Sequence, residues 1–376
     1  MHSMKITAFQ SICGVLSALF FAPVTFAHEA VAPELVVTNS LPLPFLVETR
    51  GPVGRPKPTM LASGQHASGQ GFWKFVSARE LVPVPAAAQT KVTGAHGTII
   101  VDKVADIAYW GLQGVGWIGF SNRLSAAWIV AGNPVFAAGN IHGADLLPRG
   151  KQPPLIAAAD NVSGKIHVTD TTFQNVETLT RPGFGSYATN KTFAPTDAAF
   201  ASLTELWIVD GYGQQKFISA DLSPLRWRET IHGGTEFSKT LHGVTYDKAH
   251  DDLLFSARPE GQLKHLARKS LRAKDILGLP AGTLLCDVDL WGDYCLAACL
   301  DGANKSPGPL YIINLKKRAI VSTIKPKEDL GYTDAQHIHD AAWYVTGKGR
   351  DQEVYLLFTN WNPGGVGALK LVNLPD

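Results

Sequence analysis

Charged residues are scarce in this chain of 376 residues. Asp, Glu, Lys and Arg together make up 18% of it, the formal net charge is +2, and we find no basic stripe. A nucleic-acid-binding surface needs clustered Lys and Arg, so the composition gives no support for a nucleic-acid partner. The hydrophobic content of 45% is instead typical of a globular protein with a packed core.

Apolar runs long enough to span a bilayer are also lacking. The most hydrophobic stretch, residues 12–21, follows Lys5 and is itself followed by Pro23 and by Thr25-Phe26-Ala27, which supplies small residues at the cleavage positions. This pattern predicts a secretory signal peptide over residues 1–27, with an uncleaved anchor as the alternative. We therefore expect a periplasmic or secreted protein without a membrane span in its mature form.

Cysteine is rare, with four in the chain, and Cys13 falls in the predicted signal peptide. The odd number left, Cys286, Cys295 and Cys299, allows one disulfide and one free thiol in an oxidising compartment. If residues 292–293 form a hairpin turn, residue 286 faces residue 299. We therefore predict a Cys286–Cys299 bridge, and three buried thiols are the alternative.

Helical patterns are nearly missing, and only residues 270–277 favour a short helix. From Phe72 onward, short apolar runs alternate with Gly, Asn and Asp, which is typical of β-strands joined by turns. Residues 155–161 followed by 164–168, and 206–213 followed by 216–219, are two examples. No linker interrupts residues 72–376, so we predict one domain there.

A short motif carrying His or Asp recurs along that domain. Its register positions are 96, 142, 197, 242, 287 and 339, which are 46, 55, 45, 45 and 52 residues apart. A repeat of this length that is rich in short strands is typical of a propeller blade. The sequence therefore predicts an all-β fold, a six-bladed β-propeller over residues 72–376. The Pro-rich residues 28–71 predict an extended arm, part of which completes a blade.

Histidine occupies this motif on the second, fourth and sixth predicted blades, as His142, His242 and His339. The first strand of each blade lines the central channel, so alternate blades place these side chains in a triangle around the axis. Three neutral imidazoles with an open side match the ligand count of a catalytic zinc site. Bound zinc would lower the pKa of a coordinated water or hydroxyl towards ~7.

Three further residues are candidates for catalysis. Tyr212 lies in a glycine-flanked bend and is predicted to be a general base, because a nearby cation favours the phenolate; an aromatic lid is the alternative. Arg258, in the corresponding bend of the next unit, would clamp a carboxylate, or form a surface ion pair. Asp340 follows His339, and strand neighbours point to opposite sides, so Asp340 would orient a ligand, meet substrate or cap the backbone.

At these residues the chain resembles the peptidyl-α-hydroxyglycine α-amidating lyase family, whose members are six-bladed propellers with NHL-like repeats. The likeness rests on IHGADL at 141–146, APTDAAF and LWIVDGYGQQKF within 194–217, LHGVTYD and LLFSARPEGQLKHL within 241–266, and HIHDAAWYV at 337–345. The resemblance implies zinc on His142, His242 and His339, Tyr212 as the base, and Arg258 and Asp340 in the site. It also implies a structural calcium ion held by backbone carbonyls in the channel. The reaction implied is C–N cleavage of a peptidyl-hydroxyglycine to a peptide amide and glyoxylate.

The chain departs from that family in three respects. The family binds the substrate carboxylate with an arginine on the first blade, but residues 107–112 read IAYWGL; the family's cysteine pattern is missing; and His96 is additional. We expect His96 to line the site without touching the metal, and His337 to lie at its entrance.

Several functions therefore stay open for a small-molecule or peptide substrate. The first is the lyase, and a metal-dependent hydrolase at the same residues is a variant of it. A non-catalytic propeller that binds a peptide or an unknown protein partner is the main alternative. A third is an iron site with His96 as fourth histidine, similar to carotenoid oxygenases.

Overall fold

The computed structural model describes residues 65–234 and 236–372, all of which belong to one compact unit, Ser40–Asp376. The predicted signal peptide and most of the predicted arm lie outside the described residues. Among the described residues, no helix is long and apolar enough to cross a membrane.

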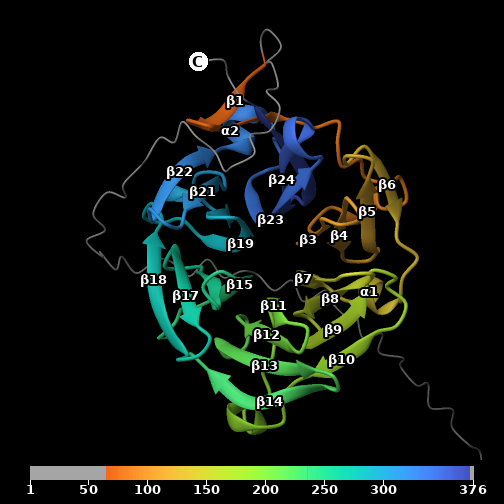
Figure 1. Cartoon of the computed structure of the whole chain (residues 1–376), viewed down its shortest axis with the longest axis vertical. Helices are drawn as coiled ribbons and strands as arrows, with labels where there is room; N and C mark the ends of the chain where they lie inside the picture. Colours follow the sequence, from red (N-terminus) through yellow and green to blue (C-terminus); the bar gives the residue numbers. More distant parts are fainter. Residues whose placement is uncertain (1–64, 235, 373–376) are drawn as a thin grey trace, which may run out of the picture. The chain divides into compact units, whose positions relative to one another are not determined.

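Six antiparallel β-sheets surround a central channel, which confirms the predicted six-bladed propeller (Figure 1). Blade one consists of β3 (Thr98–Asp102), β4 (Ile107–Leu112), β5 (Gly116–Ser121) and β6 (Ala126–Ile129). Blade two consists of β7 (Ile141–Arg149), β8 (Gln152–Asp160), β9 (Lys165–Asp170) and β10 (Glu177–Thr180). Blade three consists of β11 (Asp197–Ser202), β12 (Glu205–Asp210), β13 (Lys216–Leu222) and β14 (Leu225–His232). Blade four consists of β15 (Leu241–Asp247), β16 (Asp252–Ala257), β17 (Gln262–Ala267) and β18 (Arg272–Gly278). Blade five consists of β19 (Leu285–Trp291), β20 (Tyr294–Cys299), β21 (Leu310–Asn314) and β22 (Ala319–Ile324). Blade six consists of β23 (His337–Thr346), β24 (Glu353–Trp361) and β25 (Gly365–Val372), together with β2 (Trp73–Ser77) and β1 (Ala67–Gln70). Two short helices, α1 (Val135–Ala138) and α2 (Pro326–Leu330), lie in connections.

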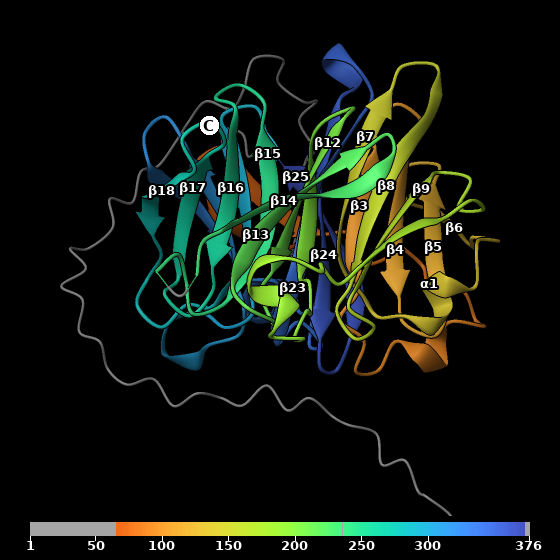
Figure 2. The ribbon, with the colours of Figure 1, turned by 90° about the horizontal axis from the view of Figure 1, so that it is seen from below.

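The first strand of each blade lies innermost. These strands contact one another in sequence around the ring, β3 to β7, β11, β15, β19, β23 and back to β3. Figure 2 turns the ring edge-on and shows the strands running along the channel axis. The hydrophobic core lies between neighbouring sheets; Ile166 of blade two and Phe200 of blade three, for instance, share one buried cluster.

The ring closes through the first described strands of the chain. β2 pairs with β25, placing Phe75 opposite Leu371, and β1 adds a fifth strand outside β2. Trp73 of β2 is fully buried, with its ring centroid 6.0 Å from that of Trp291 and 5.5 Å from that of Trp343. Burial of this large apolar ring between blades five and six holds the first described strands of the chain against its last blades.

The helix predicted over residues 270–277 is wrong, because this stretch forms the strand β18. Residues such as Ala273 and Lys274 favour helix when isolated. Here β17 supplies a pairing edge, and Ala273 lies opposite Leu266. Tertiary pairing therefore overrides the local preference.

The predicted disulfide is also wrong, and the cysteines are three buried free thiols. The turn at Gly292-Asp293 forms as predicted. The register shifts after Leu285, however, and Leu285 itself lies opposite Cys299. Cys286 is therefore the extra residue of a β-bulge and does not face Cys299.

Carboxylates on the inner strands join neighbouring blades. An innermost strand has one unpaired edge, and a buried N–H group left without a partner costs about 1–3 kcal/mol. Five carboxylates satisfy such groups on the next blade: Asp145 accepts from Phe200 N at 2.8 Å, Asp197 from Val244 N at 2.8 Å, Asp287 from Ala341 N at 3.3 Å, Asp289 from Trp343 N at 2.8 Å and Asp340 from Ile99 N at 3.2 Å. These carboxylates line a cavity in the channel, and the hydrogen bonds above link each blade to the next.

We expect one of these carboxylates, Asp145, to make stability depend on pH. Burial raises its pKa to about 6, against the opposing effect of the backbone N–H groups of Phe200 and Leu146. The pKa of an unfolded aspartate is ~3.9, so this contribution is complete below about pH 4 and is lost as the pH rises to about 6. Over that range the free energy of unfolding should fall by roughly 1–3 kcal/mol more in the wild type than in Asp145→Asn.

Urea unfolding at pH 4, 5, 6 and 7 measures this difference. The matched control is Asp275→Asn, which removes an exposed carboxylate on β18 and should keep the wild-type pH dependence. The same pH dependence in Asp145→Asn and the wild type would contradict the prediction.

Candidate metal centre

β-Bulges aim three of the predicted site histidines at the channel axis. The pairing register shifts between Ile141 and Gly143, between Leu241 and Val244, and between Ile338 and Asp340. Each shift falls where a histidine stands, and a bulge residue is re-aimed relative to the regular strand. The bulge at His339 also explains how two consecutive residues, His339 and Asp340, both take channel positions, which strict strand alternation would forbid.

Two of the predicted metal ligands, His142 and His339, bring their ring nitrogens together, and the ring of His242 lies beside them. Nε2 of His142 lies 3.2 Å from Nε2 of His339. The ring centroid of His242 lies 4.8 Å from that of His142 and 4.9 Å from that of His339. All three side chains are buried, with at most 2% of their surface exposed. Imidazoles from blades two, four and six therefore form one cluster at the axis.

Backbone carbonyls determine which ring nitrogen carries the proton in two of the histidines. Nδ1 of His142 lies 2.8 Å from the carbonyl oxygen of Thr196, and Nδ1 of His242 lies 3.0 Å from that of Cys286. A carbonyl only accepts hydrogen bonds, so both Nδ1 atoms must donate. In the neutral imidazole Nε2 is then an unprotonated acceptor. Both Nε2 lone pairs thus point towards the cluster. Metal-binding histidines are commonly oriented in the same way, by a carbonyl oxygen that accepts a hydrogen bond from the other ring nitrogen.

These carbonyls also correct the register predicted for blades three and five. The residues that stand where the other blades carry histidine are Thr196 and Cys286, one position before the predicted 197 and 287. The close approach accounts for the glycine after His142: a Cβ on Gly143 would lie 2.5 Å from the carbonyl oxygen of Thr196. On Gly243 it would lie 2.7 Å from that of Cys286. The His-Gly pairs thus let the next blade approach.

The third histidine is held in its neutral form. Burial lowers the pKa of His339 well below its ordinary value, and repulsion from His142 and His242 lowers it further. A neutral donor set suits zinc, whose nitrogen ligands lie about 2.0–2.1 Å from the ion, so that nitrogens in a tetrahedron are about 3.3 Å apart. The 3.2 Å between the Nε2 atoms of His142 and His339 fits this spacing. The residues present therefore fit a divalent metal ion.

Tyr212 and Arg258 lie directly beside the histidines. The Tyr212 hydroxyl lies 3.0 Å from Nε2 of His242 and 3.2 Å from Nε2 of His142, and it accepts a hydrogen bond of 2.9 Å from Nη1 of Arg258. Burial raises the pKa of Tyr212 to about 12, and the positive charge of Arg258 opposes this rise. Arg258 forms no ion pair within the described part of the chain, so it is not the surface ion pair offered as its alternative.

Asp340 takes a different place from the one predicted for a catalytic group. Its carboxylate accepts hydrogen bonds from Thr98 Oγ1 at 2.7 Å and from Ile99 N at 3.2 Å, both on blade one. Asp340 thus bonds to the backbone and to a hydroxyl group of the next blade. None of these described hydrogen bonds reaches His339, so Asp340 does not orient that ligand through them. This is close to the alternative of a backbone-capping aspartate.

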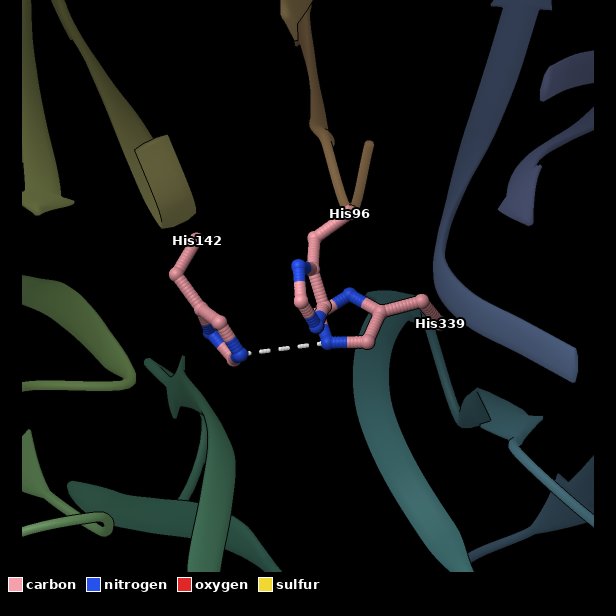
Figure 3. A group of neighbouring side chains, drawn as sticks. All are labelled: His96, His142 and His339. Carbon is pink, nitrogen blue, oxygen red and sulfur yellow. Dashed lines mark hydrogen bonds between the residues drawn. The ribbon is translucent and has the colours of Figure 1, made fainter. Parts of the chain in front are cut away.

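His96 lies closer to the cluster than predicted. His96, His142 and His339 each contribute one ring nitrogen to a group in which all three atoms lie within 4.8 Å of one another (Figure 3). The ring of His96 also stacks on Trp361 of β24, with centroids 5.4 Å apart and planes at 19°. The shared His-Gly motif could have indicated this position, but the alternate-blade argument left it out.

Comparisons with known proteins bear on the fold. No protein-family model matches the chain, and neither does any curated protein sequence. Among solved structures, the gluconolactonase of Xanthomonas campestris superposes with a TM-score of 0.52 and 12% identity, covering 79% of this chain and 97% of that one. A luciferin-regenerating enzyme gives a TM-score of 0.51 and 8% identity, covering 76% and 94%. The chain therefore shares the propeller fold of these two proteins, and at such identities only the fold is established.

His337 is partly exposed, with 24% of its side-chain surface accessible, and it is not among the histidines whose ligand nitrogens gather in the described part of the chain. Its Nδ1 is 2.8 Å from a carboxylate oxygen of Asp301, and its ring centroid is 5.7 Å from that of Trp361. Trp361 thus contacts both His96 and His337 and forms part of the wall beside the cluster. Sequence reasoning missed Trp361, because it falls at the end of β24, outside any recurring motif.

Proposed function

We propose that this protein is a metal-dependent lyase that breaks a carbon–nitrogen bond, with zinc held by His142, His242 and His339. The observation that carries the proposal is the convergence of buried imidazoles beside the Tyr212 hydroxyl, two of them with Nε2 lone pairs fixed by backbone carbonyls. Neutral imidazoles whose Nε2 atoms are unprotonated are common ligands of divalent metal ions. When bound, zinc supplies a Lewis acid that polarises a substrate hydroxyl or carbonyl.

The residues around this point can carry the proton transfers. Tyr212 lies within hydrogen-bonding distance of two histidine nitrogens, so its hydroxyl can reach a substrate group at the same place. Arg258 donates to the Tyr212 oxygen at 2.9 Å and therefore stabilises negative charge that develops there. The buried surroundings exclude water, which strengthens both interactions.

The substrate class follows from the resemblance together with this arrangement. In a carbinolamide such as a peptidyl-hydroxyglycine, one carbon carries both a hydroxyl and an amide nitrogen. A cation on the histidines would, together with Arg258, favour the phenolate of Tyr212 over its phenol. The phenolate then accepts the hydroxyl proton, the C=O bond forms as the C–N bond breaks, and the departing nitrogen takes that proton from Tyr212. The products are a peptide amide and glyoxylate, so atoms and charges balance without a further reactant.

Two accompanying predictions belong to this proposal. The predicted signal peptide supports an exported protein, periplasmic or secreted. A structural calcium ion in the channel is expected from the resemblance, and oxygen atoms are the ligands that calcium prefers.

The proposal is tested on protein purified without an affinity tag. Elemental analysis should find one divalent metal per chain, and incubation with an α-hydroxyglycine-terminated peptide should release glyoxylate. Metal-loaded protein that releases no glyoxylate would discard the substrate and the lyase. Metal-free protein that binds the peptide without cleaving it would replace the enzyme with a binding propeller.

A further inference from the structure

The ring of His96 adds a fourth imidazole to the cluster. Its ligand nitrogen comes within 4.8 Å of those of His142 and His339, and its ring centroid lies 4.9 Å from that of His339 and 5.4 Å from that of His142. Figure 3 shows the ring nitrogens of the three residues gathered together. These separations are close to the 4.5–4.9 Å between the centroids of the three predicted ligands.

The position of His96 is built into the fold. The residue lies just before β3, and the turn that carries it is joined to blade six by a hydrogen bond of 2.7 Å from Gly94 N to the carbonyl oxygen of Pro363. The next residue, Gly97, has φ +72, and a Cβ there would lie 2.2 Å from Nε1 of Trp110, so only glycine fits. On its other side the His96 ring stacks on Trp361. Backbone and ring are thus both held where the nitrogen meets the cluster.

We infer that His96 is a fourth ligand of the axial metal, and that the ion is one that accepts five or six ligands, such as Fe²⁺, Co²⁺ or Ni²⁺. Four imidazoles fill the tetrahedral shell of zinc, and a filled shell is typical of a structural zinc site that cannot take substrate. Imidazole also suits iron, nickel and copper, and larger coordination numbers keep positions open. This inference rests on the proposed metal centre and revises only its ligand number and ion.

Cobalt provides a direct test, because Co²⁺ absorbs visible light strongly when four-coordinate and weakly when six-coordinate. Wild-type protein titrated with Co²⁺ alone should bind one ion per chain and show weak visible bands. In His96→Ala the affinity should fall about 10–100-fold and the bands of the remaining complex should become several-fold more intense, because a ligand is lost. His96→Gln, which keeps most of the side-chain volume, should behave in the same way.

The matched control is His337→Ala, since His337 also contacts Trp361 but is not one of the histidines whose ligand nitrogens gather. It should keep the wild-type affinity and spectrum. Unchanged affinity and spectrum in both His96 variants would overturn the inference and leave the three-histidine centre standing. Wild-type protein that binds no Co²⁺ would instead overturn the metal centre itself. Intense bands in the wild type would show a four-coordinate ion and would also overturn the inference.

Discussion

Replacing His142 with alanine is expected to remove the metal from this protein. His142 is the histidine that the other groups share: its Nε2 lies 3.2 Å from Nε2 of His339 and 3.2 Å from the hydroxyl of Tyr212. Changes to residues that only orient a ligand cost about 10–100-fold in metal affinity, so loss of a ligand should cost at least about 100-fold, or about 2.7 kcal/mol.

The measurement is metal content after purification without a tag, followed by competition with a chelator of known affinity. His250→Ala is the control, because His250 is exposed and pairs with Asp247 at the turn between β15 and β16. It should retain the wild-type metal content. Thermal unfolding of both variants separates loss of the site from loss of the fold. Full metal content in His142→Ala would show that His142 is not a ligand.

The second large effect is expected from Tyr212→Phe. This change keeps the aromatic ring and removes only the hydroxyl that contacts His142, His242 and Arg258. A proton acceptor in the site contributes roughly 10²–10⁴-fold to the rate, so glyoxylate release should fall by that factor. Metal content should stay at the wild-type level, because the histidines remain.

The control for this variant is Tyr246→Phe, whose hydroxyl bonds to Asp251 away from the channel. Its turnover should equal that of the wild type. Unchanged turnover in Tyr212→Phe would remove Tyr212 from the mechanism. Loss of metal together with turnover would assign Tyr212 to the metal shell instead of to proton transfer.

Blade number and strand content could be predicted because they depend on local, repeated information. Each blade needs its own short apolar strands and turns, so the period of about 45–55 residues is visible along the chain. Even the closing blade follows this logic, since β2 is an ordinary apolar strand with Trp73 and Phe75 buried. The histidines at 142, 242 and 339 could be singled out for the same reason, as they recur at one place in the repeat.

The details of the site could not be predicted in this way, because they depend on which residue becomes the extra one in a bulge. A shift of one residue decides that Cys286 is the bulge residue and does not face Cys299, and that Thr196 and Cys286 supply the carbonyls behind the histidines. Such a shift arises from pairing between strands and from packing against the next blade. Neither leaves a mark on the local pattern of apolar and polar residues.

The sequence alone therefore determined the architecture, because a propeller consists of similar units and the strands and turns of each unit can be recognised in its own stretch of sequence. Only the tertiary structure decided which side chains share the axis. It brought His96 beside the predicted histidines and turned Asp340 towards blade one. The physical reason is that such contacts join residues 197 to 242 positions apart, and their geometry exists only once the ring has closed.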